Sequence, residues 1–248
     1  MRIPNLKIVT VFEIDPSIVL SCGPHLKILS KKLGGQLITI NAPEHSPPIL
    51  PRIVLKLEDT VLNVALDRFD ITITPPSHVS EDIGKASKFA NQRASTILSE
   101  LLPAISSFLW TGIVFEFEFL EEPLVSKSAI EAVTPIFDHL VSIDRKNKDM
   151  GSFELKFGLR DDVHYINYSI SGFESREFKF LPPKTSGYVR FEPSDHPIIE
   201  CGIKITVDVN NKPSGTTGDP FKDISTIFEK HSNLLTNLAV DLNLEGRL

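Results

Sequence analysis

The chain has 248 residues, of which 41% are hydrophobic and 23% charged, a balance that is typical of folded globular proteins and excludes a disordered chain or a coiled coil. Its formal net charge of -6 disfavours a whole-protein electrostatic grip on nucleic acid or anionic lipid. No apolar run approaches the ~20 residues that cross a bilayer, and acidic residues interrupt the N-terminal MRIPNLKIVTVFEIDPS, so we expect neither a membrane span nor a signal peptide.

A strand and a capped helix open the predicted order of elements. Residues 6–14 (LKIVTVFEI) are rich in β-branched and apolar residues, which favours a strand. Asp15 and Pro16 then combine an N-cap residue with a proline at the first helical position, so we predict that a helix begins there. Apolar residues recur at helical spacing as far as Gly34, and Pro24 predicts a kink or a restart inside that helix.

Three strands and a proline-rich connector are predicted next. A short strand near residues 36–40 precedes residues 41–51, whose four prolines exclude regular structure. Alternating apolar residues in 53–57 and 62–66 then predict the two strands of a hairpin. After residues 67–68 the apolar residues of the strand move from even-numbered to odd-numbered positions. We interpret this change as a β-bulge, because one extra residue turns every later side chain to the other face.

A long helix and an alternating strand complete the first half. Ser80 is placed to cap a helix whose apolar stripe runs to Leu101, and Pro103 limits that helix. The strand of residues 110–119 (WTGIVFEFEF) follows, with phenylalanines and glutamates on opposite faces.

Two carboxylates on that strand, Glu116 and Glu118, are candidates for an acid and base pair. At positions i and i+2 they point the same way, with side-chain bases roughly 7 Å apart, which is compatible with glycosidase-type carboxylate separations. Any alternating strand with one wet face gives the same geometry, however, and a catalytic acid needs burial to raise its pKa. We therefore interpret both as the solvent face of a strand, with Lys56 and Arg52 as partners if their strand is a neighbour.

The second half predicts another set of helices and antiparallel strands. Ser128 and Glu131 have the spacing of a capping box at the start of a helix. The hairpin of residues 152–173 turns at Asp161 and Asp162. The remaining elements are a strand that ends at residues 182–183, strands at 187–191 and 198–210, and a terminal helix that begins at Asp219 and carries an apolar stripe through Leu234 and Leu235 to Leu238.

We therefore predict an α+β protein of two lobes, each a mainly antiparallel sheet covered on one face by helices. The two lobes are residues 1–122 and 123–248. Similar hairpin turns at residues 57–61 (LEDTV) and 159–163 (LRDDV) are compatible with an internal duplication. The different order of the later elements leaves that question open.

Cysteine and histidine spacing supplies no metal or cofactor motif. Cys22 and Cys201 lie far apart among apolar neighbours, so we predict two buried free thiols in a reducing cytoplasm. His164 is the best functional candidate among the histidines because Tyr165 and Tyr168 lie near it, and a hydrogen-bonded structural histidine is the competing interpretation. We expect no metal, no cofactor and, without a dense basic cluster, no nucleic acid.

Three segments carry a wider pattern: LNVALDRFDITITPP before the long helix, GIVFEFEF after it, and DPFKDISTIFEKHSNLLTNL near the end. Within them, residues 67–69 (DRF) precede the long helix, and His231 is followed by Leu234 and Leu235. This order resembles a sporadically distributed bacterial family of two-lobed α+β proteins. The resemblance implies a two-lobed fold and an accessory role, and it supplies no catalytic residues.

The function that we expect is non-catalytic protein binding, as a soluble accessory component of a bacterial system in the cytoplasm. The sequence has many segments with the apolar periodicity of packed helices and strands, and it lacks the usual catalytic motifs. The partner is another protein or a second copy, which would form a dimer through an exposed sheet edge or helix face. The alternative is an enzyme or small-molecule-binding protein with a site in a groove between the lobes. Its nearest candidate residues are His164, Tyr165, Glu116 and Glu118. We expect no association with a membrane.

Overall fold

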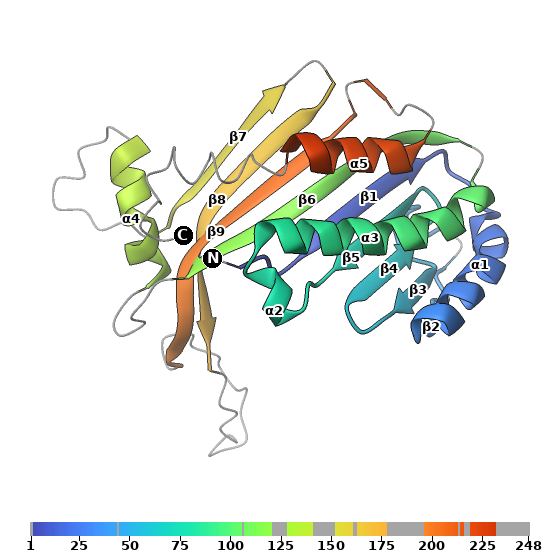
Figure 1. Ribbon diagram of the computed structural model, residues 1–248, viewed down its shortest axis with the longest axis horizontal. Helices are drawn as coiled ribbons and strands as arrows, with labels where there is room; N and C mark the ends of the chain where they lie inside the picture. Colours follow the sequence, from blue (N-terminus) through green and yellow to red (C-terminus); the bar gives the residue numbers. More distant parts are fainter. Residues whose placement is uncertain are drawn as a thin grey trace.

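The computed structural model describes residues 2–43, 45–105, 107–120, 128–140, 152–160, 163–177, 196–212, 214–215 and 219–231. Its strands form one antiparallel sheet of nine, in the order β2-β3-β4-β5-β1-β6-β9-β8-β7 (Figure 1). The strands are β1 (Leu6–Phe12), β2 (Gln36–Thr39), β3 (Ile53–Lys56), β4 (Thr60–Val64), β5 (Arg68–Ile73), β6 (Phe108–Leu120), β7 (Glu154–Arg160), β8 (Tyr165–Arg176) and β9 (Ile198–Asn210). The helices are α1 (Ile18–Leu33), α2 (Ser77–Ser80), α3 (Ile83–Leu101), the short 3-10 helix η1 (Leu102–Ala104), α4 (Ala129–Leu140) and α5 (Pro220–His231).

The sheet runs without a break through both halves of the chain. β6 pairs with β1 on one edge and with β9 on the other, so that Phe117 lies opposite Ile205. The sequence predicts two separate sheets, and this two-lobed arrangement is not confirmed, whereas the α+β class and the antiparallel pairing are. One sheet can form because the apolar residues of both halves share a face, where helices cover them. The division into residues 1–122 and 123–248 stays a prediction.

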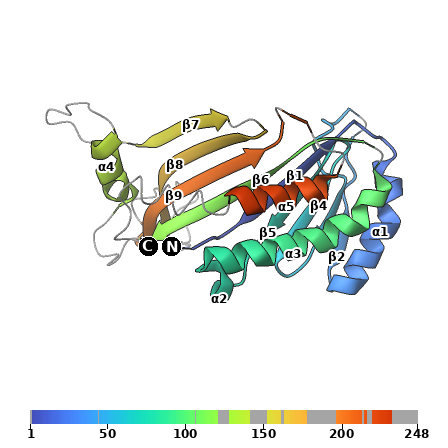
Figure 2. The same cartoon turned by 45° about the horizontal axis from the view of Figure 1, so that its top comes forward.

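The helices cover one face of the sheet, and the opposite face carries none among the described residues (Figure 2). Phe115 of β6 packs edge-on against Phe228 of α5, with ring centroids 5.8 Å apart. α4 contacts β8 and β9 at the far end of the sheet. Gly172 makes that contact possible, because a Cβ there would lie 2.5 Å from the carbonyl oxygen of Ala129.

α1 is continuous through Pro24, where the sequence predicts a kink or a restart. Pro24 is exposed, so water can satisfy the carbonyl that loses its N–H partner. At the start of the helix Asp15 accepts hydrogen bonds from the backbone N–H and the hydroxyl of Ser17 (2.8 and 2.6 Å). At its end Gly34 adopts the left-handed conformation, with φ of 71°, that C-terminal caps favour.

The parity change near residue 67 is a hairpin turn, and the predicted bulge is wrong. β4 ends at Val64 and β5 begins at Arg68, and the N–H of Ala65 donates to the carbonyl of Arg68 (3.0 Å). Val64 and Phe69 lie opposite each other, so both strands point their apolar side chains toward the helices. A reversal of the chain shifts the parity of buried residues as an inserted residue does, so the pattern alone could not separate the two.

Helix caps follow the sequence with two corrections. Helix α1 begins at Ile18 with Ser17 at its N-cap position, two residues after the Asp15 cap that the sequence predicts. The long helix α3 is capped by Asp82, whose side chain accepts from the N–H of Lys85 (3.0 Å), and not by Ser80. Ser80 instead ends the short helix α2. Asp82 has the extended backbone conformation that a cap residue needs. The predicted cap of α4 is confirmed, because the N–H of Glu131 donates to Ser128 Oγ (3.2 Å).

The core lies between the sheet and its helices, and it contains both cysteines. Cys22 and Cys201 are fully buried and belong to no disulfide among the described residues. Burial raises the pKa of the Cys22 thiol to about 12. No described helix combines the length and the apolar character that crossing a membrane requires.

Several predicted features lie outside the described residues. They are the turn at Asp161 and Asp162, the end of the strand predicted to stop at residues 182–183, the strand at 187–191, and the apolar stripe of the terminal helix beyond His231.

Candidate functional site

Glu116 and Glu118 lie on the sheet face away from the helices, as predicted, and each contacts a cation. Lys204 of β9 places its Nζ 3.1 Å from Glu116 Oε1. Arg2 donates from Nε to Glu118 Oε2 (2.7 Å) and from its two other nitrogens to the carboxylate oxygens of Glu200 (3.0 and 2.6 Å). Each carboxylate is therefore paired with a neighbouring cation on a charged surface.

Backbone pairing brings Arg2 to this position. Its N–H donates to the carbonyl of Glu118 (2.8 Å), and its carbonyl accepts from the N–H of Glu118 (2.9 Å). The hydrogen bonds to Glu200 raise the pKa of Arg2 above its ordinary value. The expected partners Lys56 and Arg52 lie in and beside β3, which β4, β5 and β1 separate from β6. The expectation assumed that β3 and β6 are neighbours in the sheet, and local sequence patterns do not determine strand order.

His164 and Tyr165 lie at a different level of the sheet from the two glutamates. Through the ladders of β8, β9 and β6, Tyr165 is level with Gly112. Glu116 lies four residues further along β6, about 13 Å at the rise of a strand. His164 is buried, with 4% of its surface exposed, and the ring of Tyr165 stacks under the guanidinium of Arg160 at 5.6 Å. The structure does not bring the four candidates together in one pocket.

A buried polar cluster ties the start of α5 to the sheet near His164. The N–H of Thr111 donates to Asn211 Oδ1 (2.8 Å), and the N–H of Asn211 donates to the carbonyl of Thr111 (3.0 Å). Asn211 Nδ2 donates to Asp223 Oδ2 in the first turn of α5 (3.0 Å). The hydroxyl of Thr111 donates to the carbonyl of Val9 in β1 (2.9 Å). These mutually bonded groups hold the fold together.

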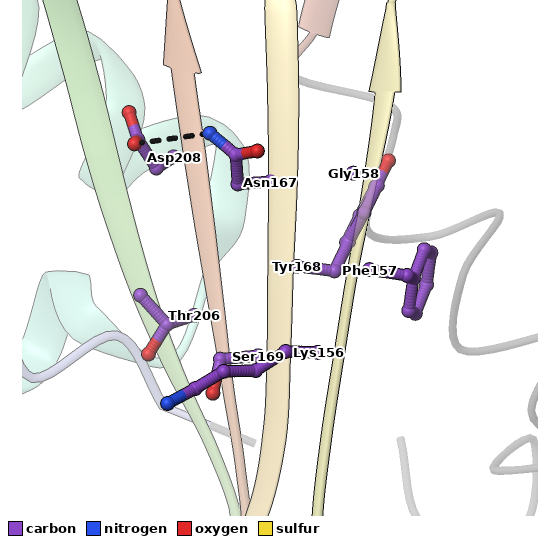
Figure 3. A pocket seen from close by; sticks show the side chains of 8 residues that line it. All are labelled: Lys156, Phe157, Gly158, Asn167, Tyr168, Ser169, Thr206 and Asp208. Carbon is purple, nitrogen blue, oxygen red and sulfur yellow. Dashed lines mark hydrogen bonds between the residues drawn. The ribbon is translucent and has the colours of Figure 1, made fainter.

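A hollow of about 430 Å³ lies on the open face over the last three strands (Figure 3). Its lining residues are Lys156, Phe157, Gly158, Asn167, Tyr168, Ser169, Thr206 and Asp208. Asn167 Nδ2 donates to Asp208 Oδ2 (3.4 Å), and Lys156 Nζ lies 2.8 Å from Glu154, whose pKa this contact lowers. Gly158 leaves room for the Asn167 side chain, because a Cβ there would lie 2.9 Å from Asn167 Oδ1.

The lining of this hollow is mostly apolar surface with a few polar groups, which suits a small molecule of the same mixed character. It offers hydroxyl groups from Ser169 and Thr206, the amide of Asn167 and one charge of each sign. A neutral ligand with an apolar body and one or two polar groups would match this lining, since its polar groups can bond to the donors and acceptors there. Among the described residues no three His, Cys, Asp or Glu side chains are grouped to hold a metal ion.

The edge strand β7 is the other surface of note. No described strand pairs with its outer edge (Figure 1). Leu155, Phe157 and Leu159 share the helix-side face of β7, but Phe157 is 37% exposed and Leu159 53% exposed. The ring of Phe157 stacks on Tyr168 of β8 at 4.8 Å. The sequence could not mark β7 as an edge, because strand order depends on pairing between distant segments.

Comparison with known proteins adds no residue roles to these surfaces: no protein-family model matches the chain, and no curated protein matches it significantly. The β7 edge and the open-face hollow are therefore ranked by their own geometry. The edge offers exposed apolar side chains on a strand whose outer side no described strand covers, whereas in the hollow Asn167 already bonds to Asp208 and Lys156 to Glu154.

Proposed function

We propose that the protein is a non-catalytic protein-binding module, an accessory component of a bacterial system that acts in the cytoplasm, and that the β7 edge is its docking surface. The observation that carries this proposal is the exposure of Phe157 and Leu159 on a strand whose outer edge no described strand covers. The opposite edge strand, β2, is only four residues long, which is a common protection of sheet edges.

The physics of strand addition supports this surface. A partner strand would form main-chain hydrogen bonds along β7 and would cover alternate side chains. Covering the exposed parts of Phe157 and Leu159 would contribute about 1 kcal/mol each. The seven residues of β7 give a ladder long enough to fix a register.

Leu159→Glu is expected to abolish capture of the partner. The tagged protein is drawn from its own cells and the eluate is analysed by native mass spectrometry. The added carboxylate would face the apolar side of the docked strand, where its desolvation costs several kcal/mol.

Leu20→Glu is the matched control, because Leu20 is 81% exposed on α1, away from β7. We expect this variant to keep the partner. Circular dichroism melts of both variants separate loss of binding from loss of fold. Equal capture by Leu159→Glu and the unmodified protein would contradict the proposed surface.

A second candidate function is binding of a small molecule, with an apolar body and a few polar groups, in the open-face hollow. The observation that favours it is the convergence of Lys156, Asn167, Ser169 and Asp208 from three adjacent strands (Figure 3). If this is the function, native mass spectrometry of the purified protein will show a bound small molecule, and Ser169→Phe, which fills the hollow, will remove it. The Leu159→Glu variant should then keep the ligand, since Leu159 points to the other face.

A further inference from the structure

We propose that the partner of the β7 edge is a second copy of this chain, paired antiparallel about a two-fold axis at Phe157. This inference rests on the proposed function, because it names the protein that the edge binds. The two sheets would become one continuous sheet, with the helices of both copies on the same face, because a two-fold axis perpendicular to the sheet preserves its faces.

The order of side chains in β7 is self-complementary in this register. With Phe157 opposite the partner's Phe157, Leu155 lies opposite the partner's Leu159, on the helix side of the sheet. On the open face Glu154 lies opposite the partner's Arg160. The two-fold axis repeats this contact, so two ion pairs form. The apolar residues that are exposed in the single chain thereby cover one another.

Local contacts of the charged residues agree with this pairing. Arg160 packs against the ring of Tyr165, 5.6 Å from its centroid, which holds the guanidinium on the open face where Glu154 of the second copy would lie. Lys156 keeps its partner Glu154 on its own strand (2.8 Å) and stands opposite the partner's Gly158, which has no side chain to obstruct it.

Neighbouring registers are disfavoured by charge or by polarity. A centre at Lys156 would set this lysine opposite itself, and a centre at Gly158 would set Lys156 opposite Arg160. Like charges directly opposite each other destabilise an antiparallel pair. A slip by one residue would turn the apolar set of one copy to the polar face of the other. A single strand pair gives a small interface, so we expect micromolar affinity.

Disulfide trapping tests the register directly. Opposite residues of an antiparallel pair have Cα atoms ~4.5 or ~5.5 Å apart, within the disulfide range of ~4.4–6.8 Å. Phe157→Cys should therefore form a covalent dimer under mild oxidation. Cys22 and Cys201 are buried and should not compete.

Leu155→Cys is the matched control, because Leu155 is offset from its own copy by about 13 Å in this register. It should not link to itself but should link to Leu159→Cys in a mixture of the two variants. Self-linking of Leu155→Cys that exceeds that of Phe157→Cys would overturn the register.

Charge reversal supplies a second readout without cysteines. Arg160→Glu should weaken dimerisation in analytical ultracentrifugation by about tenfold, since it places like charges opposite each other at two symmetric positions. Adding Glu154→Arg to the same chain should restore dimerisation, whereas Glu154→Arg alone should weaken it.

The inference and the proposed function can fail separately. A protein that stays monomeric at high micromolar concentration, but captures a different protein through a surface that Leu159→Glu destroys, would overturn the self-pairing alone. A monomer that captures no protein would overturn both.

Discussion

Asn211→Ala is expected to lower the free energy of unfolding by about 3 kcal/mol. The substitution removes the acceptor of the Thr111 N–H and the amide that donates to Asp223, so that two buried polar groups each lose a hydrogen bond. Asn211 is 4% exposed and Asp223 6% exposed, and water therefore has little access to replace these bonds. Urea unfolding monitored by circular dichroism measures the change.

Two variants make this test specific to the buried cluster. Asn167→Ala removes an exposed asparagine with one bond, to Asp208 on the open face, and should change stability by less than about 0.5 kcal/mol. Asn211→Asp keeps the acceptor for Thr111 but places a second carboxylate beside Asp223. It should therefore also destabilise the protein, because Asp223 loses its donor and faces a second buried carboxylate. Equal effects of the two alanine variants would show that the cluster does not hold α5.

Phe117→Ala is expected to lower the free energy of unfolding by about 4 kcal/mol. Phe117 is fully buried in β6, with Phe115 stacked beside it at 6.1 Å. It lies opposite Ile205, where the two halves of the sheet meet. Truncation of a buried phenylalanine removes its transfer free energy and leaves a cavity, and this site has a sheet on one side that cannot collapse into the space. Urea unfolding again measures the effect.

The adjacent substitution Glu116→Ala is the matched control for Phe117→Ala. It removes a partly exposed ion pair with Lys204 and should cost about 0.5 kcal/mol or less. The contrast between the two neighbours tests the assignment of faces along β6. A loss from Glu116→Ala as large as that from Phe117→Ala would mean that the glutamate has a buried role.

The local pattern of the sequence was enough to predict most elements and their buried faces. The alternation in residues 110–119 places Phe115 and Phe117 toward the helices and Glu116 away from them, because the two-residue period of a strand leaves no other arrangement. The stripe that ends at Leu101 predicts α3 for the same reason at helical spacing. Such features depend only on neighbours along the chain.

Features that depend on distant pairing could not be predicted from local patterns. The bond between Arg2 and Glu118, the junction of β6 with β9 and the edge position of β7 all join or expose segments far apart in sequence. For the candidate site, His164, Tyr165, Glu116 and Glu118 were selected for their residue types, and the ladders place them at different levels. The hollow was missed because its polar residues come from three separate strands.

The central position of β1 has a consequence for folding during synthesis. β1 lies between β5 and β6, and Leu6 lies opposite Phe115, so the first strand finds its second neighbour only after the long helix α3 has been made. At ~5–20 residues per second, one edge of β1 stays open for about several seconds on the ribosome. Contacts of such large sequence separation also slow folding, toward the range of roughly milliseconds to seconds. An open strand edge can pair with other chains, so this edge of β1 is exposed to aggregation until β6 has been made.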